Sequence, residues 1–165
     1  IDYDFILNNL SLVPQNPFFA NGSIKENLCF GIDKDKINLD KVYKVLKVVE
    51  LFDFINEMDQ KIDTIIGEKG ATLSGGQLQR LGIARSLYSN PDVLILDELF
   101  VGGDASFVKR GQERMKRMIN RSNVMVLASH DQSLLRSLCD RFIWLDHGKI
   151  VADGDATVLD QYSAI

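Results

Sequence analysis

The sequence predicts an α/β protein built around a parallel sheet, because two apolar strands follow a long helix. Residues 93–96 (VLIL) and 124–128 (VMVLA) are continuous apolar runs, as expected for strands covered on both faces of a parallel sheet. Residues 72–88 (TLSGGQLQRLGIARSLY) predict a helix that begins at Ser74 and that Asn90-Pro91 stops. Strands alternating with helices are typical of this fold class.

The composition is that of a soluble globular chain of 165 residues, with 45% hydrophobic and 25% charged residues. A net charge of -4 argues against a nucleic-acid partner, which would favour a basic surface. No apolar run approaches the roughly 18 residues of a membrane span, and no signal peptide opens the chain. Cys29 and Cys139 lack metal-ligand spacing, which favours a reducing cytosol. The start at Ile1 without Met indicates a fragment.

The start of the helix at Ser74 has the features of a phosphate site. Ser74 and Gln77 form a capping box, and Gly75 and Gly76 leave the first-turn N–H groups bare. The positive end of a helix with free N–H groups favours an anion. The alternative is an ordinary loop before an amphipathic helix. The apolar face that anchors this helix consists of Leu78, Leu81, Ala84, Leu87 and Tyr88.

The N-terminal part predicts one strand followed by short helices. Residues 10–13 form a strand that Pro14 ends, so Gln15 lies at a strand exit, where side chains meet ligands; a solvated loop glutamine is the alternative. Ser23 and Glu26 form a second capping box, which starts a helix through Leu28 that Gly31 closes. Two further helices are expected over residues 38–50 and 51–58.

The segment 63–70 predicts an exposed loop, because Gly67 and Gly70 bracket the charged pair Glu68-Lys69. A salt-bridged turn without function is the alternative.

Two carboxylates follow the strand over residues 93–96. Asp97 and Glu98 at the end of a buried strand are costly unless negative charge is needed there. Asp97 coordinating Mg²⁺, with Glu98 orienting a water, meets that need. The alternative is a capped strand end with one acid in a salt bridge. Asp104 is expected to cap a helix over residues 105–120.

The second apolar strand leads into Ser129-His130-Asp131, where His130 can donate a hydrogen bond to a phosphate oxygen. Asp131 can cap a helix over about residues 132–139. His147 is assigned to a hairpin turn between residues 142–145 and 150–152, without a functional role.

Taken together, Gln15, residues 73–77 (LSGGQ), residues 94–98 (LILDE) and His130 resemble the nucleotide-binding domain of ABC transporters over nearly the whole chain. The resemblance implies a P-loop NTPase fold, a RecA-like parallel sheet with an inserted α-helical signature subdomain, of which this chain is a partial domain. The implied parts are the end of the N-terminal core with the Q-loop strand (1–19), the helical subdomain with the signature motif (20–90), and the RecA-like core with Walker B, D-loop and switch histidine (91–165).

The resemblance also implies a role for each matched residue. Gln15 would be the Q-loop glutamine, which senses Mg²⁺ and the attacking water and communicates with the membrane domain. The signature motif would press on the γ-phosphate of an ATP molecule held mainly by a partner subunit. The remaining assignments are Ser74, Gly75, Gly76 and Gln77 in the signature motif, Asp97 as the Walker B aspartate, Glu98 as the catalytic glutamate, Asp104 as the D-loop aspartate, His130 as the switch histidine, and Glu68 as the acid that faces the coupling helices of exporters.

The implied function is ATP hydrolysis that powers export, with ATP and Mg²⁺ as cofactors. The implied partners are a second nucleotide-binding domain, arranged head to tail, and a transmembrane domain, with the chain on the cytoplasmic side of the membrane. A non-hydrolysing module that offers only the signature face to a partner is the alternative. A soluble ABC protein of translation or DNA repair is disfavoured by the exporter-like residues 14–31 and by the acidic balance.

The sequence departs from the family pattern in two places. It contains no Gly-x-x-x-x-Gly-Lys-[Ser/Thr], so the loop that cradles phosphate is expected upstream of Ile1 or is absent. Residues 99–104 (LFVGGD) lack the usual Thr-Ser-Ala-Leu and, with residues 139–145, are similar to polysaccharide and teichoic-acid export ATPases, whereas residues 13–77 resemble fused exporters.

Overall fold

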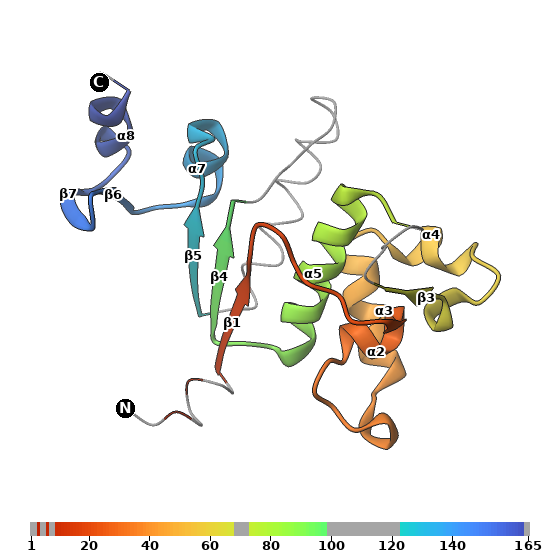
Figure 1. The fold of residues 1–165 in the computed structure, drawn as a ribbon. Coiled ribbons are helices and arrows are strands. Elements are labelled where there is room, and N and C mark those ends of the chain that lie inside the picture. Colours follow the sequence, from red (N-terminus) through yellow and green to blue (C-terminus); the bar gives the residue numbers. More distant parts are fainter. Residues whose placement is uncertain (1–2, 4–5, 7–8, 68–72, 99–122, 164–165) are drawn as a thin grey trace. The chain divides into compact units, whose positions relative to one another are not determined.

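A computed structural model describes residues 3, 6, 9–67, 73–98 and 123–163 (Figure 1). The chain divides into two compact units, residues 1–128 and 129–165. Asp104 and Glu68 lie outside the described residues.

The first unit contains a three-stranded parallel sheet with the order β1-β4-β5. In this sheet Val13 is paired with Leu96 and Asp97 with Ala128, so the three strands end at the same edge. Figure 1 shows the three arrows side by side and pointing the same way. The predicted α/β class and both predicted apolar strands are confirmed. The strands are β1 (Leu10–Val13), β4 (Val93–Asp97) and β5 (Val124–Ala128).

The expectation that both apolar strands are covered on two faces is wrong for the described residues. Leu94 and Leu96 of β4 are buried, but Val124 and Val126 of β5 are half exposed, at 50% and 49%. Side chains alternate between the faces of a strand. The helix α5 (Gly75–Ser89) packs against β1. β5 is the last strand of the described sheet, and its side chains are more exposed than those of the central strand β4.

In the first unit α2 (Ile24–Leu28), α3 (Leu39–Val48) and β1 each pack against α5 (Figure 1). Both predicted capping boxes are present, at Ser23 with Glu26 and at Ser74 with Gln77. The helices are α2 (Ile24–Leu28), α3 (Leu39–Val48), α4 (Phe52–Asn56) and α5 (Gly75–Ser89), with 3-10 helices η1 (Lys34–Lys36) and η2 (Lys61–Asp63).

The segment expected to be only a loop contains a short strand, β3 (Ile65–Ile66), which pairs antiparallel with β2 (Gly22–Ser23). Ile66 is buried, whereas Ile65 is 56% exposed. The pairing joins segments that are more than 40 residues apart in the chain. It holds the start of α2 against the segment that leads toward α5.

The second unit is an antiparallel hairpin packed with two helices. The turn at His147 and Gly148 has positive φ at both residues, 46° and 74°, as a type I′ hairpin requires, so the predicted role of His147 in a hairpin turn is confirmed. Asp131 caps α7 as predicted, by accepting from the N–H groups of Ser133 and Leu134. The elements are α7 (Gln132–Leu138), β6 (Phe142–Asp146), β7 (Lys149–Gly154) and α8 (Thr157–Tyr162).

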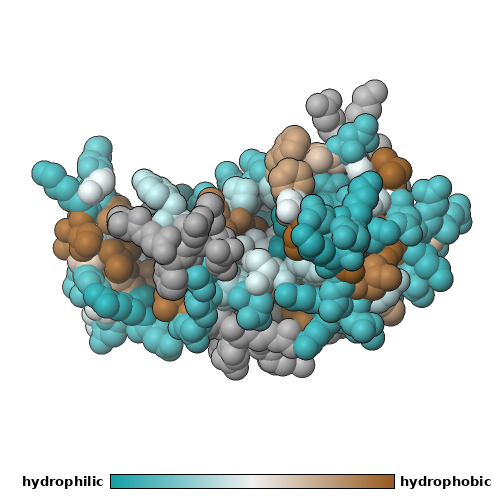
Figure 2. All heavy atoms as spheres, turned by 90° about the horizontal axis from the view of Figure 1, so that it is seen from below, coloured by the Kyte–Doolittle hydropathy of each residue, from teal (hydrophilic) through white to brown (hydrophobic). Residues whose placement is uncertain are grey.

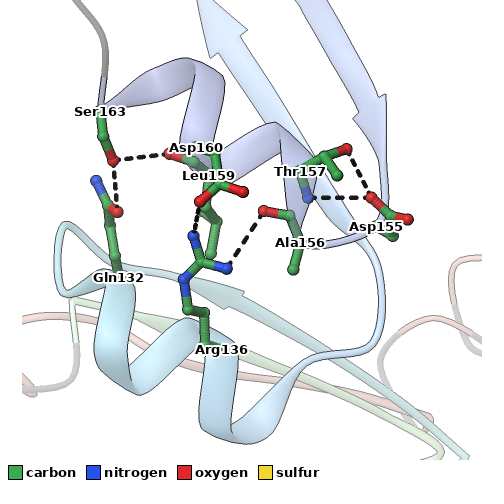
Figure 3. Close-up of polar contacts among 8 residues, drawn as sticks. All are labelled: Gln132, Arg136, Asp155, Ala156, Thr157, Leu159, Asp160 and Ser163. Carbon is green, nitrogen blue, oxygen red and sulfur yellow. Dashed lines mark hydrogen bonds and ion pairs between the residues drawn. The ribbon is translucent and has the colours of Figure 1, made fainter.

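Polar side chains join α7 to α8 around a small core (Figure 3). Arg136 forms an ion pair with Asp160, and the Ser163 hydroxyl lies 2.8 Å from Oε1 of Gln132. The core beneath them consists of the buried side chains Phe142, Val158 and Leu159.

The surface is mostly hydrophilic on the face drawn in Figure 2, with separate apolar patches. Among the described helices none is long and apolar enough to cross a membrane. Cys29 and Cys139 are both free thiols.

Candidate functional site

Gln15 and Asp97 leave the sheet at the same edge. Pro14 follows the last residue of β1 and cannot donate to the sheet, so the chain turns out and Gln15 becomes exposed. Val13 is paired with Leu96, and Asp97 comes directly after it with an exposed side chain. In open α/β proteins ligands bind at this carboxyl edge.

Glu98 has a backbone conformation that side chains rarely adopt, with φ at 48°. Its N–H donates to the carbonyl of Ala128 in β5 at 2.9 Å. Its own carbonyl accepts from Nε2 of Gln79 in α5 at 3.3 Å. A left-handed residue other than glycine persists only where its surroundings hold it, and here two hydrogen bonds from different elements hold the Glu98 backbone.

The start of α5 is open and carries no negative side chain. Oγ of Ser74 accepts from the Gln77 N–H at 3.3 Å, and the Ser74 N–H donates to Oε1 of Gln77 at 2.7 Å. A Cβ built on Gly75 or Gly76 would meet no heavy atom within 4 Å. The first turn of this 15-residue helix contains no acid, so its positive end is not neutralised from within. The geometry is suited to an anion.

The side of α5 behind this start packs on the segment that follows Gln15. A Cβ on Gly82 would lie 2.9 Å from Cβ of Pro17, so the helix can approach this closely only with glycine at this position. Three residues on, the Arg85 guanidinium donates to the carbonyls of Phe18 at 2.8 Å and Asn27 at 2.7 Å. The helix with the LSGGQ segment and the loop with Gln15 are therefore parts of one packed structure.

Arg80 lies one turn into α5. Its guanidinium donates to the carbonyls of Gly76 at 3.4 Å and Glu50 at 3.3 Å. Burial lowers the pKa of Arg80 below its ordinary value. The positive charge near the helix start is therefore partly withdrawn from water, which strengthens its action on a nearby anion.

His130 belongs to the second unit and comes two residues after the last residue of β5. It is exposed, and the following residue, Asp131, donates its N–H to Oγ of Ser129 at 3.1 Å.

The structure brings Gln15, Asp97 and Glu98 to one sheet edge within the first unit. Within the described residues there is no group of three or more His, Cys, Asp and Glu side chains that could hold a metal ion alone.

Gln79 and Arg85 were not predicted as functional residues, although the structure connects Gln79 to Glu98 and Arg85 to the loop after Gln15. Gln79 is 7% exposed, although it stands in a helix whose apolar positions were taken as the packing face. A polar side chain and a glycine on one helical face, at Gln79 and Gly82, were the available indication of a close and specific contact. Spacing alone does not say which partner such a residue has.

Comparisons with known proteins identify the family of the chain. The ABC transporter family model matches residues 2–101, and the chain belongs to this family. ABC transporter B family member 17 of Arabidopsis thaliana is 38% identical over 88% of this chain and 12% of its own length. The lactococcin-G-processing and transport ATP-binding protein LagD of Lactococcus lactis is 33% identical over 96% of this chain and 22% of its own length.

A solved bacterial Atm1-family ABC exporter with ATP bound has a similar fold, with a TM-score of 0.81 and 28% identity over 95% of this chain and 27% of that chain. The chain is therefore similar to the nucleotide-binding domain of exporter-type ABC transporters. It spans between about an eighth and a quarter of the length of these relatives.

Proposed function

We propose that the chain is part of an ATP-hydrolysing domain that powers export by an ABC transporter. The observation that carries this proposal is the sheet edge at which Gln15, Asp97 and Glu98 leave neighbouring strands, with the LSGGQ helix bonded to the Glu98 backbone. We assign residues 1–19 and 91–165 to the RecA-like core and residues 20–90 to the signature subdomain. Family membership and the ATP-bound exporter of similar fold support this assignment.

Asp97 and Gln15 are suited to hold Mg²⁺ together with ATP. Both side chains are exposed at one sheet edge and present oxygen atoms, the ligands that Mg²⁺ prefers. Mg²⁺ commonly takes one or two protein ligands and completes its shell with phosphate and water, so these two residues suffice without a larger metal cluster. The ion would neutralise charge on the phosphates. Glu98 would orient the attacking water.

The open start of α5 would contact the γ-phosphate of an ATP molecule held by a second nucleotide-binding domain, in a head-to-tail pair. Ser74, Gly75, Gly76 and Gln77 supply the contact surface, and His130 would donate to a phosphate oxygen. Asp104 is assigned to ATP binding as the D-loop aspartate, and Glu68 to the coupling with the transmembrane domain; both lie outside the described residues. The domain would act on the cytoplasmic side of the membrane.

The decisive experiment replaces Glu98 with Gln in the complete protein that contains this chain. Gln keeps the shape but cannot accept a proton, so we expect a loss of ATP turnover of about 100-fold or more, with ATP-bound dimers retained on size-exclusion chromatography. Asp92→Asn is the matched control, because Asp92 is an exposed acid at the opposite end of β4. Unchanged hydrolysis in the Glu98 variant would contradict the proposal.

The alternative is a module that does not hydrolyse ATP and supplies only its signature face. The open start of α5, which has no acid in its first turn, is the feature that such a module would offer to its partner. Binding of a fluorescent ATP analogue is measured for this chain alone and mixed with an intact ABC ATPase domain. If the ATP analogue binds only in the mixture, and the complete protein does not hydrolyse ATP, the module is supported.

A further inference from the structure

We propose that Gln79 is a positioning residue for Glu98, and that it links the two ATP sites of a dimer within each subunit. The inference rests on the proposed function, because it concerns how the residue that orients water is held. Gln79 lies one turn after the open start of α5 and is not among the residues assigned to phosphate or Mg²⁺. It is important because it connects α5 to the backbone of Glu98.

The contact is specific and largely withdrawn from water. Gln79 is 7% exposed in α5, and its Nε2 donates to the Glu98 carbonyl at 3.3 Å. A buried amide without a hydrogen-bond partner lowers the free energy of unfolding by about 1–3 kcal/mol. The bond from Gln79 to Glu98 avoids this cost and fixes where the amide lies. Here the acceptor is the backbone of the residue assigned to catalysis.

The Glu98 backbone needs such support because its φ of 48° is unfavourable for a residue with a Cβ. The N–H side is held by the carbonyl of Ala128 at 2.9 Å. The carbonyl side is held by Gln79. If this second bond is lost, the Glu98 backbone can relax toward a negative φ. That change would point the Cα–Cβ bond in another direction and move the carboxylate. A displacement of about 1 Å is enough to slow an enzymatic reaction severely.

The same bond joins two different sites of the proposed dimer. In the head-to-tail arrangement, the start of α5 contacts ATP held by the other subunit, whereas Glu98 acts on ATP held by its own subunit. Gln79 lies one turn after the open start of α5 and touches Glu98. A shift of α5 when the start contacts one nucleotide is therefore transmitted to the glutamate that serves the other nucleotide.

The test uses Gln79→Met, which keeps the length of the side chain and removes the donor, in the complete protein. We expect kcat to fall about tenfold with the KM for ATP within twofold, and faster hydrogen exchange of the Glu98 amide. Ser86→Ala is the matched control, because Ser86 is equally buried in α5, at 5% exposure, and is expected to leave kcat unchanged. If the Met variant does not fold, Gln79→Glu, which has nearly the same shape, replaces it with the same expectations.

Mixed dimers separate positioning from a general effect on α5. When one subunit carries Glu98→Gln, only the Glu98 of the other subunit works. We expect Gln79→Met to lower turnover when it is in the subunit with the intact Glu98, and to leave turnover unchanged when it is in the Glu98→Gln subunit. Equal losses in both arrangements, or a change in KM alone, would overturn the inference.

The failure of this inference can be distinguished from the failure of the proposed function. Loss of turnover in Glu98→Gln together with normal turnover in Gln79→Met refutes only the role of Gln79. If the wild-type protein does not hydrolyse ATP, the proposed function fails, and hydrogen exchange of the Glu98 amide still decides whether Gln79 holds this backbone. Unchanged exchange in Gln79→Met would overturn that part as well.

Discussion

The region around α2 and α5 differs from the second unit in what holds it together. In the first region a buried amide, Asn27, binds backbone groups of Ala20 before β2 and of Ser23 within β2, and Arg85 extends this network to α5. The second unit has a small apolar core with ion pairs at its surface, such as Arg141 with Asp153. Buried polar networks specify one arrangement because each member loses its partner if the geometry changes. Surface ion pairs impose little of this specificity.

The difference agrees with the proposed roles. The first region has to hold α5 against the loop that follows Gln15, and its contacts use directional bonds such as that from Arg85 to the Phe18 carbonyl. The guanidinium also lies 4.6 Å from the centre of the Phe19 ring, and burial lowers the pKa of Arg85. If the contacts indicate the energies correctly, substitutions in the buried polar network lower stability more than substitutions in the second unit.

The largest expected effect is that of Asn27→Ala. Asn27 is 1% exposed; its Oδ1 accepts from the Ala20 N–H at 2.9 Å, and its Nδ2 donates to the carbonyls of Ala20 and Ser23. Removing it leaves several buried backbone groups without this partner, so we expect a loss of about 3 kcal/mol in the stability of this region. Amide hydrogen exchange in α2 and α5 measures the loss.

Asn56→Ala is the control for Asn27→Ala, because Asn56 is exposed at the end of α4. Its effect is expected to stay within about 0.5 kcal/mol. Similar protection of α2 in both variants would show that the Asn27 network is not what stabilises this region.

A smaller effect is expected for Leu159→Ala in the second unit. Leu159 is 6% exposed and packs with Phe142 and Val158, so its truncation removes apolar contact from a core of few side chains. We expect a loss of about 2 kcal/mol, measured by hydrogen exchange of β6 and β7. Leu145→Ala is the matched control, because Leu145 is 64% exposed in β6. Equal losses in the two variants would mean that this core does not stabilise the unit.

The smallest effect depends on pH and concerns Glu26 at the start of α2. The hydrogen bond from Lys34 is the main cause that lowers the pKa of Glu26 from 4.5 to about 2, and the Ser23 N–H contributes next. The folded state thus holds the charged form more strongly than the unfolded chain does. The stabilisation is complete above pH 4.5 and is lost as the pH falls toward 2.

We therefore expect the melting temperature to decline less steeply between pH 4.5 and 2 in Glu26→Gln than in the wild-type protein. Circular dichroism at several pH values measures the difference. Glu57→Gln, at an exposed carboxyl after α4, is the control. Parallel pH curves for wild type and Glu26→Gln would contradict the assignment of this pKa.

The helix starts show how far local sequence predicts structure. Ser23, Ser74 and Asp131 cap helices as expected, because a cap bonds to N–H groups only two or three residues away. The His147 turn is equally local. The pairing of β2 with β3 was not foreseen, since it joins distant residues whose side chains show no distinct pattern.

The family and the capped starts of α2, α5 and α7 follow from local sequence, because each depends on a short stretch of chain. The residues expected to act on phosphate and Mg²⁺ stay predictions. The pairing of β1 with β4, the exposure of Val124 and Val126 in β5, and the bond from Gln79 to the Glu98 carbonyl became visible only in the folded chain. Each of these depends on the register of strands and on the depth at which a helix packs. Both result from contacts between residues far apart in the chain. A single segment does not show these contacts, so they cannot be predicted from local sequence.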